Sequence, residues 1–225
     1  VIEGSDCVVK NTQADWLIER ASNEGYKAVL FSFPDYFSFF GKTIRDYLNG
    51  KFGDFKEFDI SDIEKDLQEL DGSGRIIERI KTIANMGLQA HTRFGSMIYV
   101  NDRVKKIPEL KKAIEENDLV AGDGWDFSNW AHQGAKLPED KRWEWIEWLK
   151  KAEREEHGFP APDLAFYLNL PIDYRLRAME KREKLDMHES NIPYQRKVED
   201  LYLEIAKKEN WRIIDCLKGG EERKT

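Results

Sequence analysis

The sequence is poor in three features that would each indicate a particular class of protein. Its 225 residues contain only two cysteines, Cys7 and Cys216, whose separation excludes a disulfide framework and favours a reducing compartment. No apolar run approaches the roughly 18 residues of a membrane-spanning helix, and no secretory signal is visible. Acidic residues outnumber basic ones, giving a net charge of −7, so a general nucleic-acid-binding surface is not expected. We expect a cytoplasmic protein that binds neither membranes nor nucleic acids.

Internal repeats, low-complexity linkers and clusters of metal-binding residues are also missing from the sequence. Charged residues make up 35% and hydrophobic residues 40%, which is typical of a folded globular protein. The length suits one domain, which we expect over residues 1–217, followed by a charged tail over residues 218–225. His188 and Cys7 form no metal-binding cluster with neighbouring residues, so no zinc site is expected.

The first thirteen residues form the pattern around which the rest of the chain is organised. A short apolar run leads into a tight segment, and a helix is predicted to begin near Thr12. Strand, loop and helix in this order can bind a phosphate, because backbone N–H groups and a helix N-terminus point at the anion. Gly4 and Lys10 occupy the first and seventh places of the pattern G-x-x-x-x-G-K-[ST], whereas Val9 and Asn11 depart from it. From this pattern alone, an ordinary strand-to-helix turn remains an equal alternative.

Apolar strands alternate with long helices along the rest of the chain. Strands are predicted at residues 27–33, 119–123, 164–170 and 211–216. Helices are predicted at residues 39–48, 63–70, 127–135, 139–156, 172–181 and 192–209, with helical pieces over 76–114 that break near Gly95 and Pro108. This alternation predicts a parallel sheet with helices on both faces. Ligands of such sheets bind at the carboxyl ends of the strands, which here are residues 3–10, 33–36 and 123–133.

Several blocks of the sequence resemble those of thymidylate kinases, in the same order along the chain. Glu3-Gly4-x-Asp6 followed by Lys10-x-Thr12-Gln13 stands in the register of the family's opening loop, E-G-x-D-G-x-G-K-[ST]-T-Q. Further blocks are similar to its F-P-x-R, [ND]-R, D-R-Y…Q-G-A-K and P-D-L motifs, and these are Phe33–Tyr36, Tyr99–Arg103, Asp123–Lys136 and Pro162–Leu164. The resemblance implies an α/β fold of the three-layer P-loop NTPase type, with a parallel β-sheet flanked by helices on both faces. It also implies a helical lid near residues 174–190, whereas residues 55–96 look like an enlarged helical segment.

The resemblance also assigns roles to individual residues. It implies that phosphates of ATP are bound by Gly4, Ser5, Asp6, Cys7, Val8, Val9, Lys10, Asn11 and Thr12. It implies that the acceptor nucleotide is bound by Phe33, Pro34, Tyr36, Tyr99, Arg103, Asp123, Ser128 and Gln133. The residues expected to act in catalysis are Lys10, Asp6, Arg103 and the lid arginines Arg177 and Arg182, with Arg175 in the same basic segment. Magnesium is expected at Asn11 or Thr12 together with Asp123.

Three residues depart from the family pattern at positions that handle phosphate. Val9 replaces a glycine, which costs about 1–2 kcal/mol if its φ must be positive. Tyr36 and Gly124 each stand where the family has an arginine. Because a charged hydrogen bond contributes roughly 1.5–3 kcal/mol, the loss of both arginines predicts reduced activity in a protein that still folds.

The resemblance implies an ATP-dependent kinase that phosphorylates dTMP to dTDP, uses Mg²⁺ and forms a homodimer. Two alternatives stay open at this stage. The first is a catalytically impaired homologue that acts as a nucleotide-binding or assembly module. The second is a deoxynucleoside kinase, although Arg103 and the Gln133-Gly134 pair speak against it.

Overall fold

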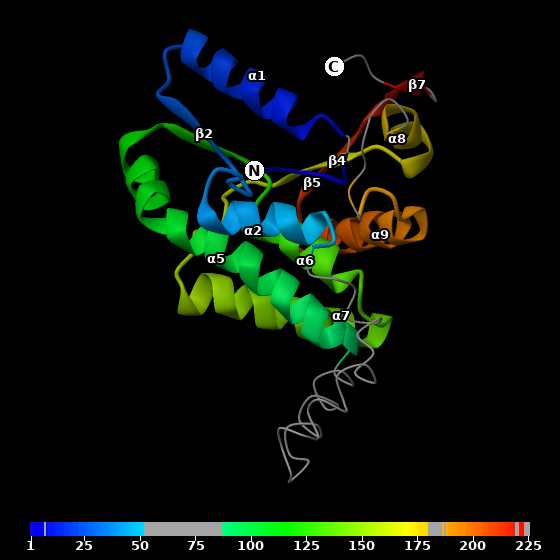
Figure 1. Ribbon diagram of the computed structural model, residues 1–225. Coiled ribbons are helices and arrows are strands. Elements are labelled where there is room, and N and C mark those ends of the chain that lie inside the picture. The colour runs from blue at the N-terminus through cyan, green and yellow to red at the C-terminus, as the bar shows by residue number, and fades with distance from the viewer. Residues whose placement is uncertain (7, 52–86, 180–185, 187, 219–220, 223–225) are drawn as a thin grey trace.

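A five-stranded parallel sheet forms the centre of the structure (Figure 1). The computed structural model describes residues 1–6, 8–51, 87–179, 186, 188–218 and 221–222. The strands of this sheet are β1 (Ile2–Glu3), β2 (Ala28–Ser32), β3 (Leu119–Asp123), β4 (Phe166–Asn169) and β5 (Arg212–Asp215). They stand in the order β2-β3-β1-β4-β5, and every pairing is parallel. Ser32 and Ile2 both pair with Asp123, so the predicted ligand-binding strand ends meet at one edge of the sheet.

Helices cover both faces of this sheet. They are α1 (Lys10–Asn23), α2 (Phe39–Leu48), α5 (Gly87–Glu116), α6 (Asp126–Gly134), α7 (Glu139–Lys150), α8 (Ile172–Met179) and α9 (Ile192–Lys208), and a π-helical turn, η1 (Lys151–Glu156), continues α7. Helix α1 lies on one face, whereas α5, α6, α7 and α9 lie beyond the other (Figure 1). The predicted three-layer α/β fold with a parallel sheet is thereby confirmed.

The hydrophobic core is divided unequally between the two faces. A large cluster fills the space between the sheet and the helices α5, α6, α7 and α9, with Trp130 and Leu201 fully buried within it. A smaller cluster joins α1 to β1 and β4 through Ala14, Ile2 and Leu168. The first strand and the loop that follows it are therefore fixed from both sides.

Two predicted boundaries differ from the structure. Helix α5 runs unbroken through both Gly95 and Pro108, because packing on both sides of the helix outweighs these local breakers. A Cβ at Gly95 would lie 2.7 Å from the hydroxyl of Tyr47 and 3.0 Å from Oε1 of Gln133, so this glycine permits close packing and does not end the helix. The predicted tail is also partly ordered, since β6 (Leu217–Lys218) pairs with β7 (Glu221–Glu222). The helix predicted at residues 63–70 and most of the 55–96 segment lie outside the described residues, as do residues 180–185 and 187 of the lid.

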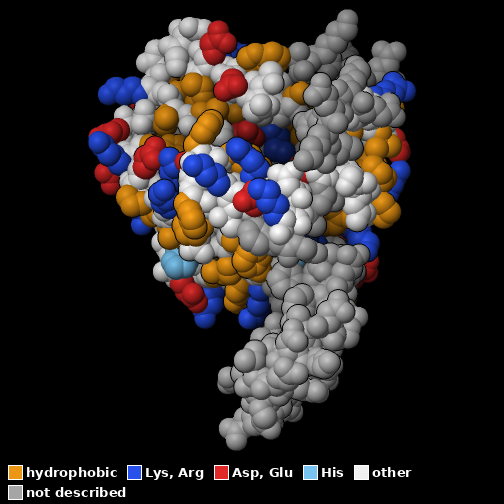
Figure 2. All heavy atoms as spheres, in the orientation of Figure 1, with side chains coloured by type: hydrophobic (Ala, Val, Ile, Leu, Met, Phe, Trp, Pro, Cys, Tyr) orange, Lys and Arg blue, Asp and Glu red, His pale blue; other side chains and the backbone are white. Residues whose placement is uncertain are grey.

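Charged side chains of both signs are spread over the surface. On the described part of the face in Figure 2, basic and acidic side chains lie among one another and do not separate into patches of one sign. Among the described residues, no helix has the length and apolar character needed to cross a membrane.

Candidate active site

The loop between β1 and α1 is tightly packed and strained. A Cβ added at Gly4 would lie 2.6 Å from Cγ2 of Val8 and 3.1 Å from the carbonyl oxygen of Leu168, so only glycine fits there. Helix α1 begins at Lys10, slightly before its predicted start. The preceding residue, Val9, has φ 53° and ψ 32°, which is the left-handed region. Because a β-branched residue adopts this region at a cost of about 1–2 kcal/mol, the strain expected from the sequence is present.

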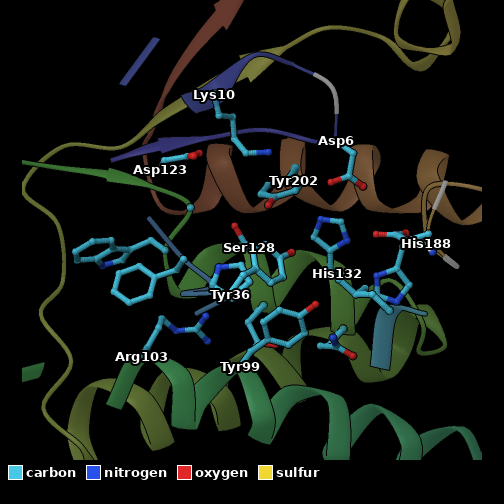
Figure 3. Close-up of a pocket in the computed structure, with 18 residues that line it drawn as sticks. Asp6, Lys10, Tyr36, Tyr99, Arg103, Asp123, Ser128, His132, His188 and Tyr202 are labelled. Carbon is cyan, nitrogen blue, oxygen red and sulfur yellow. Dashed lines mark hydrogen bonds between the residues drawn. The ribbon is translucent and has the colours of Figure 1, made fainter. Parts of the chain in front are cut away.

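The side chain of Lys10 folds back across this loop. Its Nζ donates to the carbonyl oxygens of Gly4 and Ser5, at 2.7 and 3.2 Å. The side chain also lies near Asp123 at the end of β3 (Figure 3). Burial raises the pKa of Asp123, and the charge of Lys10 opposes this rise. Within the described part of the chain no hydrogen bond reaches the Asp123 carboxylate, so it remains available to a ligand.

The predicted magnesium ligands differ in how available they are. Asp123 offers a carboxylate that accepts no hydrogen bond from any described residue, which suits Mg²⁺ because this ion prefers oxygen ligands. The amide oxygen of Asn11 accepts a hydrogen bond from the backbone N–H of Thr12 at 3.0 Å. Asp123 therefore fits the role of a magnesium ligand better than Asn11.

A cavity of about 230 Å³ lies at the carboxyl ends of β1 and β3 (Figure 3). The residues predicted from the sequence that line it are Asp6, Lys10, Phe33, Pro34, Tyr36, Tyr99, Arg103, Asp123, Ser128 and Gln133. Five polar residues that were not among the predicted site residues line it as well, namely Asn129, His132, Asp186, His188 and Tyr202. The structure thus brings together side chains from five separate stretches of the chain.

Other predicted site residues lie beside this cavity or away from it. The remaining loop residues are Gly4, Ser5, Val8, Val9, Asn11 and Thr12, which surround the start of α1. Arg177 is exposed on α8, and Cys7 and Arg182 lie outside the described residues. The assignment of Arg175 to the mobile lid is wrong. Its guanidinium is fully buried and donates to the carbonyl of Asp6 at 3.1 Å and to Glu199 at 2.9 Å, so it holds the fold together.

Glu3 connects four elements beneath the cavity. Its buried carboxylate accepts hydrogen bonds from the backbone N–H of Trp125 at 2.7 Å, the Ser128 hydroxyl at 2.7 Å and the Tyr202 hydroxyl at 3.2 Å. Burial raises the pKa of Glu3, and the hydrogen bond from Ser128 opposes the rise. These bonds link β1 to the end of β3, to α6 and to α9. The hydroxyl of Ser128 is accordingly committed to Glu3.

Asp102 fixes the loop that carries Phe33 to Tyr36. One carboxylate oxygen accepts from the backbone N–H of Asp35 at 2.8 Å, and the other accepts from the Ser38 hydroxyl at 2.7 Å. The same hydroxyl accepts from the N–H of Gly41 and caps α2. These hydrogen bonds therefore attach the loop to α5, the helix that carries Asp102.

The departures at positions 36 and 124 have different structural settings. The guanidinium of Arg45 lies over the ring of Tyr36, 5.3 Å from its centroid, so a cation stands near the place where the resemblance expects one. Burial raises the pKa of Tyr36 to about 12, which keeps its hydroxyl protonated. Gly124 has φ +73°, and a Cβ there would lie 2.9 Å from the carbonyl oxygen of Phe33. An arginine at position 124 would therefore strain this backbone.

A buried polar cluster holds Arg103, which lies across the cavity from Lys10 (Figure 3). Nε of Arg103 donates to Oε2 of Glu153 at 2.6 Å, and the amide nitrogen of Asn129 donates to Oε1 of the same carboxylate at 3.2 Å. Burial alone would lower the pKa of Arg103, but the charge of Glu153 outweighs it and the pKa is raised. Arg103 is therefore a permanent cation. Its Nη2 is buried and has no partner among the described residues.

Gln133 lies one turn beyond Asn129 on α6. Its Oε1 accepts from Nζ of Lys136 at 3.0 Å, and the same Nζ donates to the hydroxyl of Tyr47 at 2.6 Å. Its Nε2 is buried without a partner in the described part of the structure. The amide nitrogen of Gln133 is thus free to donate to a ligand.

Two histidines lie beside Asp6 in the same cavity. The rings of His132 and His188 stack with centroids 5.9 Å apart. The Tyr194 hydroxyl donates to the carbonyl of His132 at 2.7 Å and lies 3.3 Å from its Nδ1, so Nδ1 carries the ring proton and Nε2 is an acceptor. Burial lowers the pKa of His132 to about 4, so the ring is neutral near pH 7. Burial alone would raise the pKa of Asp6, but Lys10 and a hydrogen bond from Gln195 help to lower it, so its carboxylate is ionised.

Comparison with known proteins agrees with this geometry. A family model described as thymidylate kinase matches residues 67–224. A probable thymidylate kinase of Pyrococcus horikoshii is 30% identical over 99% of this chain and 89% of its own length. The human thymidylate kinase is 24% identical over 98% of this chain and 83% of its own length. The family model begins after the strained loop, but these relatives align along almost the whole chain.

Solved structures agree on the fold. A thymidylate kinase structure from Candida albicans superposes with a TM-score of 0.61 at 21% identity, covering 95% of this chain and 81% of that one. This likeness supports the arrangement of sheet and helices, while the sequence matches identify the family.

Proposed function

Since the chain belongs to the thymidylate kinase family, we propose that it transfers the γ-phosphoryl group of ATP to dTMP and forms dTDP. ATP binds at the loop between β1 and α1, and the acceptor binds in the cavity at the carboxyl ends of the strands. Bound Mg²⁺, for which Asp123 is the fitting ligand, neutralises charge on the donor phosphates.

The observation that carries the proposed acceptor is a set of three buried polar atoms, on residues that line the cavity, without partners among the described residues. They are Nη2 of Arg103, Oδ1 of Asn129 and Nε2 of Gln133. The orientation of both amides follows from their neighbours. Asn129 turns its nitrogen to the acceptors Glu153 and Ser96, and Gln133 turns its oxygen to the donor Lys136. We take these atoms to face the bound base in this order, as a donor, an acceptor and a donor.

This order is complementary to the edge of a pyrimidine with two carbonyl groups. Thymine offers an acceptor at O4, a donor at N3 and an acceptor at O2. Cytosine would instead place its amino group against the Arg103 donor and its N3 lone pair against the Asn129 acceptor. Each buried polar group left unpaired costs about 1–3 kcal/mol, so two mismatches strongly favour thymine over cytosine.

Other lining residues suit the remaining parts of dTMP. Tyr99 offers an aromatic face to the base. The ionised carboxylate of Asp6 and Nε2 of His132 are acceptors that suit a sugar hydroxyl. The loop fixed by Asp102 carries Tyr36 into the lining of the cavity, and we assign it to the acceptor phosphate.

The transfer itself depends on positioning and on charge. Lys10 must exchange the carbonyl oxygens of Gly4 and Ser5 for phosphate oxygens when ATP binds. We expect the strained Val9 and the missing arginines at positions 36 and 124 to reduce the rate, with Arg45 beside Tyr36 and Lys10 in the same cavity as described cations. The family match favours this kinase over an impaired binding module or a deoxynucleoside kinase.

A coupled assay with ATP, Mg²⁺ and a panel of nucleotides tests the proposal. The panel contains dTMP, dUMP, dCMP, dAMP and dGMP. We expect the highest kcat/KM for dTMP, with dUMP next because it has the same hydrogen-bonding edge, and a value for dCMP lower by at least about a hundredfold. Phosphorylation of dCMP or a purine nucleotide in preference to dTMP would contradict the proposed acceptor. No turnover of any nucleotide would contradict the proposed reaction.

The family resemblance further leads us to propose a cytoplasmic homodimer. Sedimentation velocity at micromolar concentration checks the oligomeric state. A single species with the mass of one 26.4 kDa chain would contradict it.

A further inference from the structure

Glu153 lies outside every motif of the sequence. Its carboxylate nevertheless contacts Arg103 and Asn129, two of the three residues proposed to bind the base. Only 1% of its surface is exposed. One carboxylate oxygen accepts from Nε of Arg103 at 2.6 Å, and the other accepts from the amide nitrogen of Asn129 at 3.2 Å. A single carboxylate therefore bridges the side chains of Arg103 and Asn129.

The backbone that positions Glu153 is irregular. It belongs to the π-helical turn η1, which continues α7, and its carbonyl oxygen accepts from the backbone N–H of Phe159 at 2.9 Å. A π-helical turn is wider than an α-helical turn, and such turns occur often at functional sites. Here the turn places a buried carboxylate beneath the cavity.

The charge of this carboxylate decides how the Asn129 amide is turned. Both partners of the amide nitrogen, Glu153 Oε1 and the carbonyl oxygen of Ser96, can only accept hydrogen bonds. The oxygen of Asn129 is therefore turned away from both partners, and it accepts no hydrogen bond from any described residue. If the group at position 153 donated a hydrogen bond instead, it would oppose the Asn129 nitrogen while Ser96 still accepted from it, and the amide would no longer be held in one orientation.

From these contacts we infer that Glu153 is a positioning residue for base selectivity, because it locks Asn129 with its carbonyl oxygen toward the base. This inference rests on the proposed function and names a residue through which that function distinguishes thymine from cytosine. Glu153 touches no substrate atom itself. It acts through Asn129, and it leaves Nη2 of Arg103 free by accepting from Nε alone.

The variant Glu153→Gln tests this role, since it keeps the shape and replaces one acceptor with a donor. The oxygen of the glutamine stays with Arg103, which can only donate, so its amide nitrogen faces the amide nitrogen of Asn129 and removes one of the two acceptors that hold it. We expect the ratio of kcat/KM for dTMP to that for dCMP to fall at least about tenfold, mainly through weaker use of dTMP. This ratio does not depend on the fraction of active protein, so loss of stability does not obscure it.

The matched control is Asp126→Asn, which makes the same chemical change in the neighbouring buried ion pair. Asp126 binds Arg154 at 2.6 Å and does not line the cavity. We expect it to lower the melting temperature and to leave the dTMP to dCMP ratio within about twofold of the unmodified protein. An equal fall in both variants would overturn the inference, because selectivity would then follow general loss of packing.

A double variant tests the path through Asn129. In an Asn129→Ala background the central acceptor is already gone, so adding Glu153→Gln should change the ratio by less than about twofold. Two independent falls that multiply would overturn the assigned path, and an unchanged ratio in Glu153→Gln alone would overturn the role. If the unmodified protein prefers dTMP and Glu153→Gln keeps that preference, only the inference fails. If the unmodified protein neither binds nor phosphorylates dTMP, the proposed function fails and the inference with it.

Discussion

The left-handed backbone of Val9 is a single-residue feature whose cost can be measured. Glycine adopts φ near 53° without the Cβ penalty, although it loses more entropy on folding. Since Val9 is 45% exposed, little packing is lost with its side chain. We therefore expect Val9→Gly to raise the free energy of unfolding by about 0.5–1 kcal/mol and to strengthen ATP binding. Chemical denaturation and titration calorimetry measure the two effects.

Asn210→Gly provides the control for this substitution. Asn210 also has a positive φ, 58°, but asparagine tolerates this region. Its replacement should change the free energy of unfolding by less than about 0.5 kcal/mol. A Val9→Gly protein that is less stable than the parent would show that the loop is not under strain.

The partly buried ring of His132 predicts a loss of stability in acid. Its pKa is about 4 in the folded protein, below the usual value near 6.5, because burial disfavours the charged ring. Above about pH 6.5 this histidine is neutral in both the folded and the unfolded protein. As the pH falls from about 6.5 toward 4, the unfolded protein binds a proton that the folded protein does not, so the free energy of unfolding decreases. We expect about 2 kcal/mol of this loss between about pH 7 and pH 5. His132→Phe should remove it, as denaturation curves at the two pH values would show.

Burial raises the pKa of Asp186 to about 6, so protonation of this carboxyl makes the free energy of unfolding increase as the pH falls. This opposite effect is present in both proteins, so the difference between the parent and His132→Phe reports His132. His157→Asn is the control, since His157 is exposed. An identical change in unfolding free energy with pH for the parent and His132→Phe would refute the assignment.

Sequence reasoning reached part of the candidate site at the level of residues. Asp6, Arg103 and Gln133 could be selected because they stand in recognisable blocks at strand ends or on the helices that follow. Asn129 occupies the same helix face as Gln133, one turn earlier, which is a signal that helical spacing could have supplied. No such signal exists for Glu153, because local sequence does not determine where a π-helical turn directs its side chains.

At the level of elements, the helix and strand pattern was predictable wherever apolar periodicity was strong. The strand at residues 119–123 and the helix at residues 39–48 match their predicted bounds. Helix α5 was predicted in pieces, because Gly95 and Pro108 favour helix ends locally and the contacts that outweigh them come from distant segments. Local propensity therefore failed where tertiary packing decided the outcome.

The connection between α5 and the acceptor loop gives a prediction for these two elements. Asp102→Ala removes the hydrogen bonds to Asp35 and Ser38 that hold the loop. We expect a loss of roughly 2–4 kcal/mol of unfolding free energy and at least about a tenfold rise in KM for dTMP, with KM for ATP changed less than about threefold. Denaturation and steady-state kinetics measure these effects.

Asn101→Ala is the matched control for Asp102→Ala. The Asn101 amide contacts only the Met97 carbonyl of its own helix by hydrogen bonding in the described structure. It should leave both KM values close to those of the parent protein. A rise in KM for ATP equal to that for dTMP would show that Asp102 supports the whole site and not the acceptor loop in particular.

For the whole molecule, ATP binding is coupled to stability through Lys10. A ligand at a hundred times its Kd adds about 2.7 kcal/mol to the free energy of unfolding. Lys10→Ala should weaken ATP binding at least about tenfold and remove roughly 1.4 kcal/mol of this gain, since the ammonium group would otherwise bind the phosphates. Thermal unfolding with and without ATP measures the difference. The exposed Lys151, changed to alanine, should keep the full gain, and an equal gain in Lys10→Ala would remove Lys10 from the ATP site.

One turn of α5 also joins two parts of the site. Asp102 holds the loop that carries Phe33 to Tyr36, and the adjacent Arg103 lines the cavity, so the same helical segment positions both. The cavity holds about 230 Å³, and a purine needs more room than a pyrimidine. Selection by size is independent of hydrogen-bonding chemistry. Adenylate and guanylate should consequently remain excluded even in the Glu153→Gln protein, in which the discrimination between the two pyrimidines is weakened.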